Sequence, residues 1–180
     1  MFNEITSAVL ENGIFIVDIL ILLFLIAVFY KKVLKKESAL VDDFFSFIRK
    51  YYFLLAFLVV LVATLGSLFY SEIIGYPLCP LCWAQRIFIY PLVIIFGVAL
   101  YYKNPGVIKY SIALSVFGLA IAIYHYISQV LQTSVCDVAP GGADCIVKYI
   151  NAYGYITFPM MAITIFMIII ILGLIKLKKI

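Results

Sequence analysis

The chain has 180 residues, of which 67% are hydrophobic and 12% charged, and its net charge is +4. A soluble domain of this length cannot bury so much apolar surface in one core, whereas a lipid bilayer can solvate it. The composition therefore excludes an ordinary soluble domain and predicts an integral membrane protein. Its basic residues gather beside the apolar stretches, so we expect no nucleic-acid partner.

Five apolar stretches run approximately over residues 14–30, 53–69, 87–102, 108–130 and 156–175. A helix needs roughly 20 apolar residues to cross the hydrocarbon, where only helices or closed barrels satisfy their backbone. None of the stretches alternates with the period of two that a barrel strand requires. The sequence therefore predicts an all-α integral membrane protein with five spans in the lipid bilayer.

The basic residues predict how these spans are oriented. If the chain crosses the membrane at each stretch, all thirteen Lys and Arg residues except Arg86 and Lys148 lie on one side. Basic residues near span ends stay cytoplasmic, so we expect the N-terminus outside and the C-terminus inside. Residues 37–50 predict a short amphipathic helix on the cytoplasmic face. Asp18, within the first stretch, is expected to be an interfacial residue near the outer end of that span.

The four cysteines form two local pairs, and this orientation puts both pairs outside, where disulfides form and persist. The first pair is Cys79 and Cys82, in the sequence Cys-Pro-Leu-Cys-Trp-Ala-Gln-Arg. Pro80 suits the first turn of a helix, so we expect the third span to begin there with Cys82 in its first turn. The helix macrodipole stabilises a thiolate at that position.

Arg86 lies one helical turn after Cys82 and on the same face. A guanidinium at the membrane edge is costly without an acceptor, so we expect the Cys82 thiolate or a bound carbonyl oxygen to be its partner. The alternative is that Arg86 only anchors the helix at the lipid headgroups.

The second pair is Cys136 and Cys145, with Pro-Gly-Gly at residues 140–142 between them. Alone it fits a structural staple as well as a redox role, but beside a Cys-x-x-Cys pair we favour exchange between the pairs. Four thiolates could instead bind zinc, yet eight residues separate the second pair, so we expect no metal site. The single histidine, His125, lies near the outer end of the fourth span, where it could be a hydrogen-bonded bundle residue or shuttle a proton.

The octapeptide at residues 79–86 resembles the signature of the disulfide bond formation protein B family (DsbB, with its BdbC-type relatives). Two further features match the order of that family. Tyr-His-Tyr at residues 124–126 precedes the outer cysteine pair, and Gly-Tyr-Ile-Thr-Phe-Pro-Met at 154–160 opens the last span. The resemblance covers roughly residue 53 to the C-terminus and leaves the first span outside.

The resemblance implies that residues 51–180 form a four-helix redox bundle. Residues 1–50 would add an N-terminal transmembrane helix and the cytoplasmic amphipathic segment. A member of this family oxidises an extracytoplasmic thioredoxin-like (DsbA-like) dithiol oxidase and passes the electrons to the membrane quinone pool, as ubiquinone or menaquinone. The protein would thus generate disulfides for secreted proteins from the bacterial cytoplasmic membrane.

The resemblance also implies a role for each site residue. Cys79 and Cys82 would be the quinone-coupled pair, and Cys136 and Cys145 the partner-facing pair, with Cys136 forming the mixed disulfide. The quinone would be bound by a set of residues around the first pair, namely Cys82, Gln85, Arg86 and His125.

Two other functions remain open at this point. A vitamin K epoxide reductase-like quinone reductase uses similar parts, but its Cys-x-x-Cys lies nearer the C-terminus than the loop pair, which is the reverse of the order here. A non-enzymatic membrane scaffold with two structural disulfides would carry the same cysteines without quinone-dependent thiol oxidation.

Overall fold

The computed structural model describes residues 2–34, 39–133, 136 and 143–177. In these ranges the elements in chain order are α1 (Phe2–Leu34), α2 (Ala39–Leu68), the π-helical turn η1 (Phe69–Ile73), α3 (Pro80–Tyr102), α4 (Val107–Leu131) and α5 (Phe158–Leu177). The described residues hold five helices that are long and apolar enough to cross a membrane. The prediction of an all-α membrane protein is therefore confirmed, and each predicted span falls on one of these helices.

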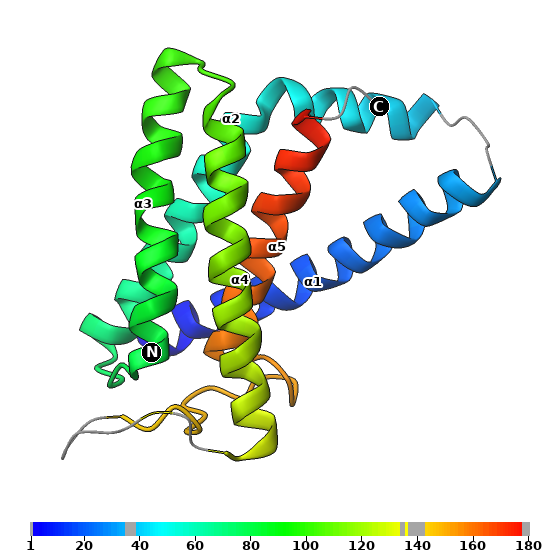
Figure 1. Ribbon diagram of the computed structural model, residues 1–180. Helices are drawn as coiled ribbons and strands as arrows, with labels where there is room; N and C mark the ends of the chain where they lie inside the picture. The colour runs from blue at the N-terminus through cyan, green and yellow to red at the C-terminus, as the bar shows by residue number, and fades with distance from the viewer. Residues whose placement is uncertain (1, 35–38, 134–135, 137–142, 178–180) are drawn as a thin grey trace.

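The bundle consists of α2, α3, α4 and α5. In it α4 packs against α3 and α5, and α2 packs against the same two helices. Figure 1 shows α1 crossing the outside of the bundle obliquely, with its C-terminal half directed away from the other helices. The main partner of α1 is α5. The predicted arrangement of a four-helix bundle with an additional N-terminal helix is thus the one observed.

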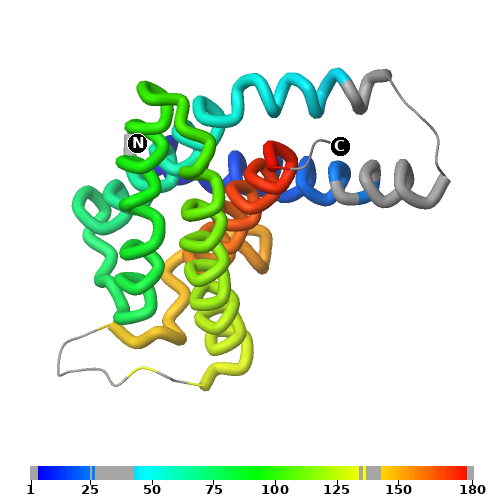
Figure 2. The backbone as a smooth tube through the Cα atoms, turned by 45° about the horizontal axis from the view of Figure 1, so that its top comes forward, coloured from blue at the N-terminus to red at the C-terminus, as the bar shows by residue number. Residues whose placement is uncertain are grey.

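The α2 helix begins in the segment that the sequence assigned to a separate amphipathic helix. Figures 1 and 2 show that its first turns run across one end of the bundle before the helix turns along the bundle. Phe45 and Ile48 are buried there, whereas Phe44 and Phe47 are more than half exposed. The segment is therefore amphipathic as predicted. It is not a separate helix, because residues 39–65 contain no Gly or Pro that would interrupt α2.

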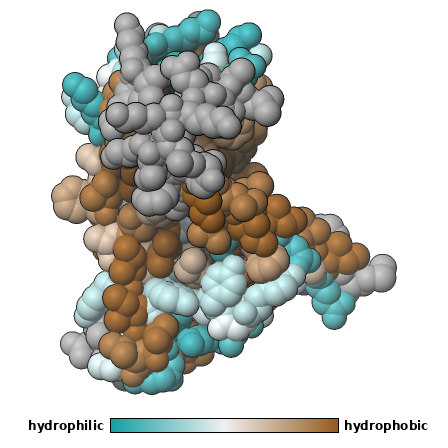
Figure 3. Space-filling view, turned by 90° about the vertical axis from the view of Figure 1, so that its right-hand side faces the viewer, coloured by the Kyte–Doolittle hydropathy of each residue, from teal (hydrophilic) through white to brown (hydrophobic). Residues whose placement is uncertain are grey.

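The segments that carry the cysteines lie at one end of the bundle. The start of α1, the connection from η1 to α3 and residues 143–157 are at the lower end in Figure 1, whereas the α3–α4 turn is at the upper end. Figure 3 shows apolar side chains across the middle of one face and hydrophilic ones towards its top and bottom. Both cysteine pairs thus share one end of a molecule that is apolar across the middle of the face drawn in Figure 3.

Close packing between α4 and α5 depends on two glycines that face large side chains. A Cβ atom on Gly118 would lie 2.2 Å from the Phe166 ring, and a Cβ atom on Gly173 would lie 2.7 Å from Ile112. Small residues let transmembrane helices approach in this way. The contact positions α4, and with it His125, against the helix that follows the second cysteine pair.

Candidate active site

The first cysteine pair is positioned by the start of α3. Pro80 is the first helical residue, as predicted, and Cys79 is the N-cap, with φ −79° and ψ 161°. The Cys79 sulfur accepts a hydrogen bond from the backbone N–H of Cys82 at 3.2 Å. One of the free N–H groups at the helix start is therefore satisfied by sulfur.

Cys79 is the acidic sulfur of the dithiol form. A hydrogen bond from the Cys82 side chain, together with His125, lowers the pKa of Cys79 below its ordinary range, although burial acts in the opposite direction. The surroundings of Cys79 therefore favour its thiolate form when the pair is reduced. The sequence placed the stabilised thiolate at Cys82. In the structure the Cys79 sulfur accepts from the backbone N–H of Cys82, so both cysteines lie at the helix start, and the thiolate at Cys82 stays a prediction.

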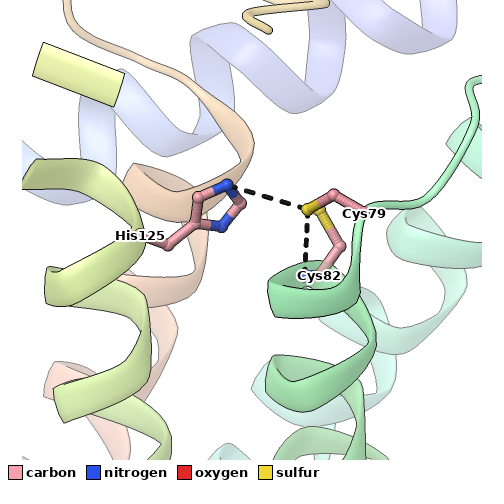
Figure 4. Close-up of side chains that lie close together, drawn as sticks. All are labelled: Cys79, Cys82 and His125. Atoms are coloured by element: carbon pink, nitrogen blue, oxygen red, sulfur yellow. Dashed lines mark hydrogen bonds between the residues drawn. The ribbon is translucent and has the colours of Figure 1, made fainter. Parts of the chain in front are cut away.

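His125 lies between the two cysteine pairs and is 1% exposed. Its Nε2 is 3.0 Å from the carbonyl oxygen of Cys145 and 3.8 Å from the Cys79 sulfur. Figure 4 shows the contact with Cys79. Its Nδ1 is 2.9 Å from Nε2 of Gln85. A carbonyl oxygen only accepts, so Nε2 carries a proton, and Nδ1 accepts from the Gln85 amide. The imidazole thus directs one N–H towards both redox pairs.

All four cysteines gather at one place although the pairs are far apart in sequence. Cys136 and Cys145 are joined by a disulfide, with their Cα atoms 6.0 Å apart, whereas Cys79 and Cys82 are free thiols. Cys79 and Cys145 are buried with Ala143 in one cluster, and Cys82 and Cys136 pack against it. The two pairs are therefore in contact. The turn predicted at residues 140–142 lies outside the described residues.

Arg86 is buried and bonded to α2. It is 6% exposed, its Nε donates to the Ser67 hydroxyl at 2.9 Å, and its Nη2 donates to the Ser67 carbonyl oxygen at 2.7 Å. Its guanidinium also lies over the rings of Trp83 and Tyr90, 5.4 and 5.7 Å from their centroids. Burial and these two bonds disfavour the alternative of a headgroup anchor, and the expected contact with the Cys82 thiolate or a bound carbonyl oxygen stays a prediction. Ser67 was missed by the sequence analysis, and the only signal for it was the small Gly-Ser step inside an apolar span.

A cavity of about 520 Å³ opens beside the first pair. At one end it is lined by polar groups from α3 and α4, namely Cys79, Cys82, Gln85, Arg86 and His125. Beyond them its walls are mostly apolar and come from α1, α2 and α5, for example Ile14, Val62 and Ile165. The cavity therefore suits an amphipathic ligand with a polar head near the cysteines and an apolar tail.

Three atoms of this site also have the spacing of metal ligands. The sulfurs of Cys79 and Cys82 and a ring nitrogen of His125 lie within 4.8 Å of one another. Two thiolates and one imidazole are a donor set that zinc accepts. The expectation that the protein holds no metal stays a prediction, and the zinc content of the purified protein will test it.

A helical membrane bundle with a dithiol, a disulfide and a buried histidine in contact defines a membrane protein of thiol–disulfide chemistry. The sequence model described as "Disulfide bond formation protein DsbB" matches residues 49–176. The chain belongs to this family, as its octapeptide predicted. Family membership indicates that it is an oxidoreductase of disulfide bond formation.

Individual relatives agree with the family match. The chain is 37% identical over 127 residues to the probable disulfide formation protein C 2 of Bacillus cereus, covering 71% of this chain and 91% of that protein. It is 43% identical over 135 residues to the SPbeta prophage-derived disulfide bond formation protein B of Bacillus subtilis, covering 72% and 90%. No solved structure matches the chain significantly. The family match leaves α1 and the first turns of α2 outside.

Proposed function

We propose that this protein is a protein-dithiol:quinone oxidoreductase of a bacterial cytoplasmic membrane, with its cysteine end outside. It reoxidises an extracytoplasmic thioredoxin-like dithiol oxidase and passes the electrons to a membrane quinone. One observation carries the proposal: His125 contacts Cys79 of one pair and Cys145 of the other at the polar end of an apolar cavity.

On the partner side, a thiolate of the reduced partner attacks Cys136, and Cys145 leaves as a thiolate. Cys145 then attacks Cys79 of the oxidised first pair, which forms a Cys79–Cys145 bond and releases Cys82. The second thiolate of the partner resolves the mixed disulfide and releases Cys136. Cys136 attacks Cys145 and releases Cys79. The partner departs oxidised, the Cys136–Cys145 bond is restored, and Cys79 and Cys82 hold both electrons as a dithiol.

Two observations support this order of exchange. Cys79 and Cys145, whose sulfurs must form the bond between the pairs, are buried in the same cluster. Cys79, the last leaving group, has its pKa lowered by the Cys82 side chain and His125, and a thiol of lower pKa leaves faster.

On the membrane side, the residues present fit a quinone. A quinone has a ring with carbonyl oxygens that accept hydrogen bonds and an apolar isoprenoid tail, and the cavity combines polar groups beside the cysteines with mostly apolar walls. Arg86 has five N–H donors, of which Ser67 takes two, and it lines the cavity beside Gln85. A bound quinone would accept two electrons and two protons from the dithiol. Arg86 would orient the ring, and His125 would hold a proton beside the Cys79 sulfur.

The test is anaerobic mixing of the purified oxidised protein with a reduced thioredoxin-like protein and a quinone, while the quinone absorbance is followed. We expect one quinone to be reduced per partner disulfide formed. Parallel runs with ubiquinone and menaquinone identify the acceptor. A partner disulfide formed without loss of quinone absorbance would contradict the membrane half of the proposal, and no partner oxidation at all would point to a structural scaffold.

A further inference from the structure

The helix α1 forms part of the cavity wall although it lies outside the family match. Four of its residues that line the cavity are spaced as one helix face, at positions i, i+3, i+4 and i+7, namely Leu10, Gly13, Ile14 and Val17. The opposite walls come from α2 and α5. Without α1, the apolar part of the cavity would be an open groove between those two helices.

Polar contacts hold the N-terminal half of α1 in this place. Asp18 accepts hydrogen bonds from the Thr164 hydroxyl at 2.6 Å and from the Tyr155 hydroxyl at 3.2 Å. One turn earlier, the Tyr153 hydroxyl donates to the Asn12 side chain, and the ring of Phe15 stacks on Tyr153 at 4.3 Å. Asp18 is thus more than the interfacial residue expected from sequence, because it joins α1 to α5. These contacts attach α1 next to the cavity.

On its cavity-facing side, α1 touches α2 at Leu10 and leaves a notch at Gly13. A Cβ atom on Gly66 of α2 would lie 3.6 Å from both methyl groups of Leu10, which is ordinary van der Waals contact, so the two helices touch there. One turn further along α1, a Cβ atom on Gly13 would have nothing within 4 Å. Gly13 therefore leaves open space between α1 and the other walls.

We propose that α1 encloses the isoprenoid tail of the quinone, with the Gly13 notch as the place where the tail passes. This inference rests on the proposed function and adds a specificity element to it. Because the tail leaves lipid for the cavity, little hydrophobic energy is gained, and the shape of the wall decides which tails enter. The helix outside the family match thus turns an open groove into a channel that selects its acceptor by the tail.

Gly13→Phe tests this inference, because its ring would fill the notch and its Cβ atom would meet no other atom within 4 Å. Ile16→Phe is the matched control, because Ile16 is 56% exposed on α1 and does not line the cavity. Gly13→Leu is a smaller second variant for the case that the phenylalanine impairs folding, which thermal unfolding in detergent reports. Quinone binding is read from quenching of Trp83, the single tryptophan of the chain, whose ring stacks on the cavity-lining Arg86.

Each protein is titrated with a long-tailed quinone and with the same ring without a tail. We expect Gly13→Phe to weaken binding of the tailed quinone about tenfold, or ~1.4 kcal/mol, while tail-free binding changes less than about twofold. Gly13→Leu should give a smaller loss in the same direction, and Ile16→Phe none. Equal affinities in all variants, or an equal loss for both quinones, would overturn the inference. If neither quinone quenches the unmodified protein, the quinone part of the proposed function fails, and the inference fails with it.

Discussion

Arg86 offers the sharpest test of the proposed quinone site, because it is bonded to Ser67 of α2 and also lines the cavity. Ser67 accepts from two nitrogens of the guanidinium, at 2.9 and 2.7 Å, and Arg86 also lines the cavity. Arg86→Met removes both sets, whereas Arg86→Lys keeps the charge but loses the planar fork. Ser67→Ala removes only the hydroxyl that orients Nε. Arg86→Met therefore tests the charge, Arg86→Lys tests the planar geometry of the donors, and Ser67→Ala tests the bond that holds the guanidinium in place.

The magnitude follows from the contact that the ligand would lose. A hydrogen bond to a charged group is worth about 1.5–3 kcal/mol, which corresponds to roughly ten- to a hundredfold in affinity. We expect this loss in apparent quinone affinity for Arg86→Met, a smaller loss for Arg86→Lys, and only a few-fold loss for Ser67→Ala. Turnover at saturating quinone should recover in part.

The assay is a quinone titration of steady-state partner oxidation, accompanied by a single-turnover measurement of exchange between the partner and the Cys136–Cys145 pair. That exchange should be unaffected, because in the proposed relay Arg86 acts on the quinone side of the first pair. Arg49→Met is a matched control, since Arg49 bonds to the Phe45 carbonyl in the part of α2 that lies far from the cysteines. An unchanged quinone dependence in Arg86→Met would refute a role for Arg86 in holding the quinone.

Three further predictions concern the cysteines. Alkylation of Cys79 in the reduced protein should have its pH midpoint below the ordinary thiol pKa, because only the thiolate reacts. A midpoint near 9.0 would exclude the lowered pKa. His125→Leu removes the contacts to the Cys79 sulfur and the Cys145 carbonyl, so it should move that midpoint upward and slow transfer between the pairs about tenfold, whereas Gln85→Leu should affect both less. All four cysteines of reduced, intact cells should react with an impermeant thiol reagent added outside, and labelling only after the cells are opened would contradict the predicted orientation.

Much of the fold and of the site follows from local properties of the sequence. The five spans are visible because the apolar length needed to cross a bilayer is a property of each segment alone. The start of α3 is equally local, since Pro80 fits the first turn and Cys79 precedes it. The octapeptide at residues 79–86 identified the family from one short stretch, and the family match over residues 49–176 confirms it.

Tertiary structure alone decided which of these groups meet. His125 reaches both cysteine pairs because α4 packs on α5 through Gly118 and Gly173, and each glycine fits a side chain far away in the chain, Phe166 and Ile112 respectively. The bond from Arg86 to Ser67 and the position of α1 over the cavity likewise join segments that no local pattern relates. Hydropathy and helix capping are set by neighbouring residues, whereas contacts between transmembrane helices depend on the shapes of surfaces that form only when the helices pack together.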